Sequence, residues 1–147
     1  KKHSDYFEGR PPNGFKNYTE VNDKVLAFHC DVIQPIHELT QKDFDYIQSV
    51  INHYPNLKLI SFHCAYRSKK CFKYKGIGYI EGYCYSEDEM KTNMRNNISQ
   101  IKQIVGNIDI LIENNNYYPT KAYDIVTDAK FISDIVYENV FIRPSPC

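Results

Sequence analysis

Three polar side chains stand at the ends of short apolar runs and have the chemistry of metal ligands. His29, His63 and Glu113 close the runs at residues 25–29, 57–63 and 108–113. Two imidazoles and a carboxylate suit zinc, manganese or ferrous iron. We therefore predict that His29, His63 and Glu113 bind one divalent metal ion. Glu113 is also a candidate general base, since a carboxylate beside a reacting group can accept its proton.

The three runs must lie side by side if these ligands are to meet. Each run is short and rich in β-branched and aromatic residues, which is typical of strands. Between the first two runs, Phe44, Ile47 and Ile51 recur at helical spacing, and between the last two an apolar stripe extends from Met90 to Val105. The alternation predicts an α/β fold of consecutive parallel βα units. The carboxyl ends of parallel strands share one edge of the sheet, where ligands bind.

Local signals predict where the helices begin and end. Thr40 is the expected N-cap of a helix that ends near His53. Ser86 and Glu89 form a capping box, and Gly106 is a typical helix stop. A third helix is expected to begin at Thr127 and to bury an apolar face within residues 131–136. Residues 140–142 then resemble the start of another strand.

Two segments read as irregular. Residues 1–24 are rich in turn-forming residues and include one short strand near residues 6–8, whereas residues 64–85 form a long βα loop above the ligand edge. Between residues 67 and 75, cations alternate with aromatic side chains, so Arg67 and Lys73 are candidates to bind a phosphate or a nucleic-acid backbone. The alternative is a solvated loop whose lysines keep the protein soluble.

The remaining polar residues near these runs have simpler interpretations. Asn114 follows the proposed ligand Glu113, so it is expected either to orient substrate or to cap a turn. His37 falls in a loop and is read as a surface residue. Five cysteines without a CxxC pair predict reduced thiols rather than disulfides or a cysteine zinc site.

Length and composition limit the architecture. The 147 residues, 42% of them hydrophobic, suit a single domain at residues 1–147. Lys plus Arg (18) equals Asp plus Glu (18), so net charge offers no general attraction to nucleic acid or membrane. No apolar stretch approaches the ~20 residues of a membrane span. We expect a soluble cytoplasmic protein with no membrane partner.

Three motifs carry a family resemblance: AFHCD at residues 27–31, SFHCAYR at 61–67 and LIENNNYY at 111–118. They resemble the xylose isomerase-like TIM barrels, which include sugar isomerases and epimerases, endonuclease IV and DUF692-type metalloenzymes. The similarity covers about residues 25–139, and residues 111–136 are its most specific part. The resemblance implies part of a (βα)8 barrel, with His29 and His63 as ligands from two earlier strands and Glu113 as a metal-bridging glutamate.

This resemblance implies a divalent-metal-dependent isomerase or epimerase acting on a sugar or sugar phosphate. An endonuclease IV-like phosphodiesterase is an alternative that the basic loop favours and the neutral charge disfavours. A DUF692-like iron enzyme that modifies a peptide is another, and a non-catalytic truncated binding module is a third.

The later strands of the family supply further ligands, and no counterpart follows Asn139. We therefore expect a partial barrel, completed by a second copy or by a partner chain. An open barrel exposes sheet edges and apolar surface, so the isolated chain is expected to dimerise or aggregate.

Overall fold

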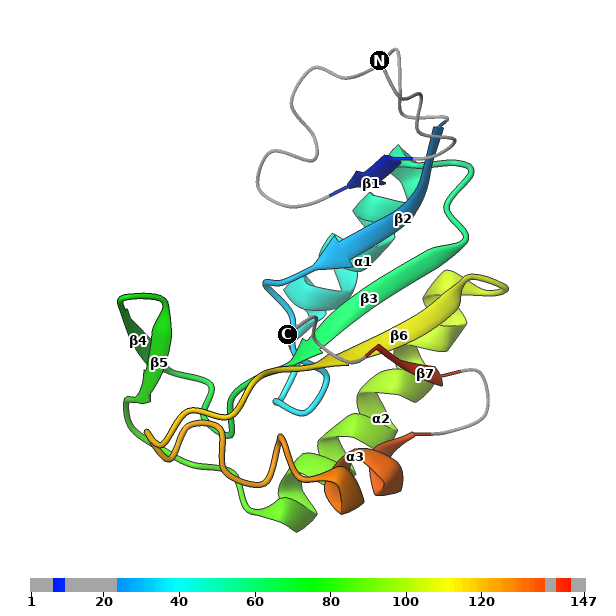
Figure 1. Cartoon of the computed structure of the whole chain (residues 1–147). Coiled ribbons are helices and arrows are strands. Elements are labelled where there is room, and N and C mark those ends of the chain that lie inside the picture. Colours follow the sequence, from blue (N-terminus) through cyan, green and yellow to red (C-terminus); the bar gives the residue numbers. More distant parts are fainter. Residues whose placement is uncertain (1–6, 10–23, 137–139, 144–147) are drawn as a thin grey trace.

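A computed structural model describes residues 7–9, 24–136 and 140–143 of the chain. Its main sheet has the strand order β1-β2-β3-β6-β7, and every neighbouring pair is parallel. These strands are Phe7–Gly9 (β1), Val25–Cys30 (β2), Leu59–Cys64 (β3), Asp109–Asn114 (β6) and Val140–Arg143 (β7). The helices are Gln41–His53 (α1), Glu87–Val105 (α2) and Ala129–Ile135 (α3). The predicted α/β fold with a parallel sheet is confirmed (Figure 1).

The two faces of the sheet have different surroundings. Most even-numbered residues of β2, β3 and β6 are buried, and these residues belong to one core cluster with the apolar residues of α1 and α2. Odd-numbered residues point to the opposite face because side chains alternate along a strand. That face carries the three predicted ligands. The buried strand residues are Phe28, Cys30, Ile60, Phe62, Cys64, Ile110 and Ile112.

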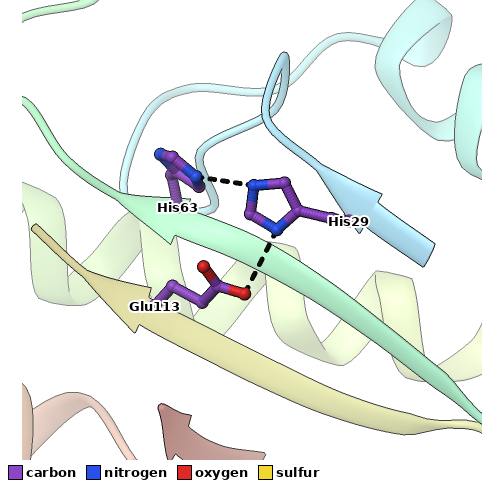
Figure 2. Close-up of side chains that lie close together, drawn as sticks. All are labelled: His29, His63 and Glu113. Atoms are coloured by element: carbon purple, nitrogen blue, oxygen red, sulfur yellow. Dashed lines mark hydrogen bonds and ion pairs between the residues drawn. The ribbon is translucent and has the colours of Figure 1, made fainter. Parts of the chain in front are cut away.

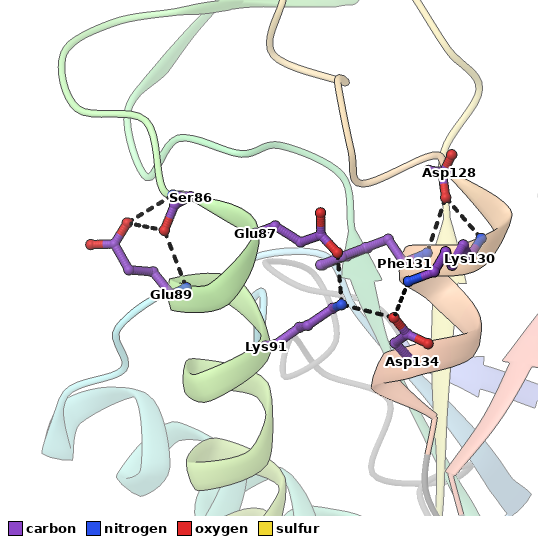
Figure 3. Close-up of polar contacts among 8 residues, drawn as sticks. All are labelled: Ser86, Glu87, Glu89, Lys91, Asp128, Lys130, Phe131 and Asp134. Atoms are coloured by element: carbon purple, nitrogen blue, oxygen red, sulfur yellow. Dashed lines mark hydrogen bonds and ion pairs between the residues drawn. The ribbon is translucent and has the colours of Figure 1, made fainter.

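Side chains at the helix starts satisfy backbone N–H groups that have no partner within the helix. In α2, Ser86 Oγ accepts from the N–H of Glu89, and the Glu89 carboxylate accepts from the N–H of Ser86, so the predicted capping box is confirmed (Figure 3). In α3, Asp128 is the cap, so the assignment to Thr127 is wrong. The Asp128 carboxylate accepts from two backbone N–H groups, whereas the Thr127 hydroxyl donates to the Tyr123 carbonyl.

An ion pair ties α3 to α2. The Lys91 ammonium of α2 lies 2.7 Å from Glu87 on its own helix and 2.8 Å from Asp134 on α3 (Figure 3). These contacts raise the pKa of Lys91 and lower that of Asp134. The two helices are therefore held together by a polar contact at their surface as well as by the apolar core.

The predicted irregular loop at residues 64–85 contains an antiparallel hairpin, so that prediction is wrong in part. Its strands are Cys71–Tyr74 (β4) and Ile77–Ile80 (β5). Lys75 and Gly76 join them with φ angles of 49° and 81°, which is the left-handed conformation of a tight hairpin turn. The hairpin projects from the end of the sheet at which β3 and β6 terminate (Figure 1).

Across the described residues, no helix has the length and apolar character needed to cross a membrane.

Candidate metal centre

The three predicted ligands lie at the carboxyl ends of three adjacent parallel strands. His29 is on β2, His63 on β3 and Glu113 on β6 (Figure 2). His63 and Glu113 are direct partners in the β3–β6 register, whereas His29 is paired with Ser61, two residues before His63 on β3. All of these residues have the same strand parity, so their side chains share the face opposite the helices.

The ligand atoms converge around His29. His29 Nε2 lies 2.7 Å from His63 Nε2, and His29 Nδ1 lies 3.1 Å from Glu113 Oε1. One potential ligand atom from each residue falls within 4.8 Å of the others. Ligands of one zinc ion lie about 2.0–2.2 Å from the metal, hence at most roughly 4.3 Å apart. The three residues could therefore hold one divalent ion once their ligand atoms adjust to these distances.

Ser61 supports this arrangement and was missed by the sequence analysis. Its side chain is buried, and Oγ lies 2.8 Å from His29 Nδ1. Because serine is small, the His29 imidazole can extend over β3 toward Glu113. The only sequence signal was a hydroxyl residue in an apolar strand, two positions before His63.

The surroundings keep His63 in the form that binds metals. Burial lowers the pKa of His63, and the nearby His29 lowers it further, while Glu113 acts in the opposite direction. The imidazole is therefore neutral at pH 7. A neutral ring retains the nitrogen lone pair that a metal requires, so no proton has to be displaced from an imidazolium.

A polar cavity of about 270 Å³ adjoins the ligand cluster. His63 lines it on one side, so a molecule in the cavity would reach the candidate metal centre. The other polar side chains come from loops after β2, β3 and β6 and from the β4–β5 hairpin. They include Asp31, Gln34, Tyr66, Lys73, Asn115 and Tyr118.

Of the three predicted substrate-binding residues, Lys73 lines this cavity, whereas Arg67 and Asn114 do not. The Arg67 guanidinium instead donates to the Tyr85 carbonyl at 3.3 Å. Asn114 pairs with Cys64 and has the opposite strand parity from Glu113, so Asn115 is the asparagine of this run that reaches the cavity. Strand alternation counted from Glu113 was the signal that could have identified Asn115.

His37 is buried, so its interpretation as a surface residue is wrong. Its ring stacks on Tyr85, and Nε2 donates to the Tyr66 carbonyl at 2.6 Å. Burial lowers the pKa of His37. The loop after β2 packs against the chain that follows β3. His37 and Tyr66 are 29 residues apart in the sequence, so a local pattern does not reveal their contact.

The buried cysteines beside the ligands are poor thiolate donors. Cys30 directly follows His29, and Cys64 directly follows His63, but both belong to the core on the helix side of the sheet. Burial raises the pKa of each thiol to about 12. At neutral pH both remain protonated, which favours imidazole and carboxylate as the ligands.

Comparison of the chain with protein-family models, with curated proteins and with solved structures finds no match. The interpretation of this site as a candidate metal centre therefore rests on its geometry alone. Two histidines and a glutamate gather at the carboxyl edge of a parallel sheet, beside a polar cavity.

Proposed function

We propose that this chain forms part of a divalent-metal-dependent isomerase or epimerase that acts on a sugar or sugar phosphate, within a barrel of the xylose isomerase-like type. One observation carries the proposal. Ligand atoms of His29, His63 and Glu113 lie within 4.8 Å of one another at the ends of adjacent parallel strands, next to a polar cavity. In this proposal the face opposite the helices is the interior of the barrel.

Zinc, manganese or ferrous iron bound there would polarise a sugar carbonyl and its neighbouring hydroxyl. The neutral His63 and the Glu113 carboxylate would hold the ion, and Ser61 would keep the His29 ring in place. Asp31 and Asn115 supply hydrogen-bonding groups for sugar hydroxyls in the cavity. Glu113 could alternatively accept a substrate proton, because a carboxylate at this position faces the same reacting atoms.

Metal binding tests this proposal directly. The affinity of the 147-residue chain for Mn²⁺, Zn²⁺ and Fe²⁺ would be measured by calorimetry, and bound metal by elemental analysis. We expect His63→Ala and Glu113→Gln each to lose most of the bound metal. His53→Ala at the end of α1 is the matched control, since it removes an imidazole outside the centre. Unchanged metal content in both centre variants would refute the ligand assignment.

An endonuclease IV-like phosphodiesterase is the second candidate, because the hairpin is basic and exposes aromatic rings. Phe72 and Tyr74 are 53% and 58% exposed, between lysines that could contact phosphates. Cleavage of DNA with an abasic site by the metal-loaded protein would favour this activity over sugar isomerisation. A stable monomer that binds no metal would instead favour a non-catalytic binding module. Bound iron with the absorbance of a di-iron centre would favour a DUF692-like enzyme.

A further inference from the structure

The β4–β5 hairpin is tied to the rest of the protein at Gly78. The Gly78 N–H donates to the Tyr123 hydroxyl at 2.8 Å, and its carbonyl accepts from the Thr120 hydroxyl at 2.6 Å. A Cβ atom added at Gly78 would clash with the Tyr66 ring, so glycine is the residue that fits here without a shift of that ring. Both backbone groups of Gly78 are bound by the loop after β6.

The base of the hairpin is fixed as well. Ser68 is buried, and its hydroxyl donates to the Tyr83 carbonyl at 2.7 Å. The Glu81 N–H donates to the Lys70 carbonyl at 2.9 Å, which closes the hairpin where it leaves the sheet. With contacts at its base and at Gly78, the hairpin is a fixed wall of the cavity rather than a free flap.

Cross-strand pairing separates the two faces of this wall. Phe72 pairs with Tyr79, and their rings stack on the outer face with centroids 5.2 Å apart. Lys73 pairs with Gly78 on the other face, which borders the cavity. Because Gly78 has no side chain, the Lys73 side chain has no cross-strand neighbour to cover it.

Lys73 is the lysine of this segment that lines the cavity of His63. Lys69 donates to the Glu38 carbonyl, and Lys75 lies over the Tyr74 ring. In the part of the chain that the structure describes, no carboxylate forms an ion pair with Lys73. Asp31 also lines the cavity but forms no ion pair with Lys73, so the ammonium group is suited to an anionic group of a molecule bound beside the candidate metal centre.

We propose that Lys73 binds a phosphate or carboxylate group of the substrate in this cavity, and that the Gly78 contact holds Lys73 in position. The substrate is then a small polyhydroxy compound with one anionic end. This inference rests on the proposed function, because the end of the substrate opposite its anionic group would bind at the metal centre. The positive charge of Lys73 selects the anionic end, and the fixed hairpin limits the length of the molecule between the two groups.

The test uses the 147-residue chain loaded with Mn²⁺, with inorganic phosphate and glycolate as separate probes. Calorimetry measures their affinity, and paramagnetic relaxation of the ³¹P or carboxylate ¹³C signal reports binding near the metal. We expect one of the two anions to bind and Lys73→Met to weaken it roughly tenfold or more, with Mn²⁺ affinity unchanged. Lys70→Met is the matched control, since Lys70 does not line this cavity.

Two further variants test the anchor of the hairpin. Gly78→Ala and the milder Thr120→Val should weaken anion binding while Lys73 is still present and Mn²⁺ still binds. If the Thr120→Val variant binds the anion as tightly as wild type, the Gly78 contact does not position Lys73. If wild type and Lys73→Met bind both anions equally, or neither anion binds to the Mn²⁺-loaded protein, the inference is overturned. Lys73-dependent anion binding without Mn²⁺ binding would instead refute the metal centre alone.

Discussion

Replacing Ser61 by alanine tests whether the small side chain between the ligands positions His29. The substitution removes the hydroxyl 2.8 Å from His29 Nδ1 and leaves all three proposed ligands in the chain. Ser61 is 4% exposed, so water cannot readily take the place of the hydroxyl. The imidazole should then turn more freely about its side-chain bonds.

The size of the effect follows from the remaining contacts. His29 Nδ1 still lies 3.1 Å from Glu113 Oε1, so it retains a partner after the substitution. The free energy of unfolding should therefore fall by only ~0.5–1.5 kcal/mol, the usual net contribution of one hydrogen bond. Loss of a group that orients a metal ligand typically lowers metal affinity about 10- to 100-fold. We expect the lower end of this range, because Glu113 still restrains the ring.

Two measurements separate these effects. Mn²⁺ affinity would be determined by calorimetry and unfolding by urea titration, for wild type and Ser61→Ala. Ser49→Ala is the matched control, since its hydroxyl donates to the Tyr46 carbonyl on the exposed surface of α1. We expect the control to keep its metal affinity. A Ser61→Ala protein with wild-type metal affinity would refute the positioning role of Ser61, whatever its stability.

Three further predictions concern the fold. Ser86→Ala should lower the free energy of unfolding by about 1 kcal/mol, because α2 loses its N-cap, and a urea titration identical to wild type would argue against that cap. Met94→Ala should cost ~2–5 kcal/mol in the same assay, because the side chain is fully buried; a cost below about 1 kcal/mol would mean that the core there is loosely packed. Burial lowers the pKa of His37, so as the pH falls the unfolded state takes up the proton before the folded state does. The contribution of His37 to the free energy of unfolding should therefore be complete above the ordinary pKa of 6.5 and decrease as the pH drops below that value. His37→Gln should make urea midpoints at pH 7.5 and pH 5.5 more alike, and an equal difference in both proteins would contradict this assignment.

Much of the main sheet was predictable because its signals are local. Strands β2, β3 and β6 lie within one or two residues of the predicted runs, and α1 and α2 begin after the predicted caps, Thr40 and Ser86. Apolar spacing reports which side of an element is buried, and a capping side chain acts on backbone groups within one turn. The TIM-barrel arrangement itself remains a prediction.

The β4–β5 hairpin was not predicted, because the alternation of cations and aromatic side chains between residues 67 and 75 was interpreted as a basic loop. The position of the hairpin on the protein also depends on distant residues. Tyr123 binds Gly78 across 45 positions of the chain, and Thr120 binds it across 42. The turn formed by Lys75 and Gly76 was a second local sign of this hairpin.

The sequence by itself determined which chemical groups this protein has at the ends of its strands. Imidazole, imidazole and carboxylate follow three apolar runs, and consecutive βα units bring such ends to one edge of a sheet. Only the tertiary structure decided the distances between them. The register of β2 on β3 pairs His29 with Ser61, and the register of β3 on β6 pairs His63 with Glu113. Register depends on packing between residues more than 30 positions apart, so no local pattern contains it.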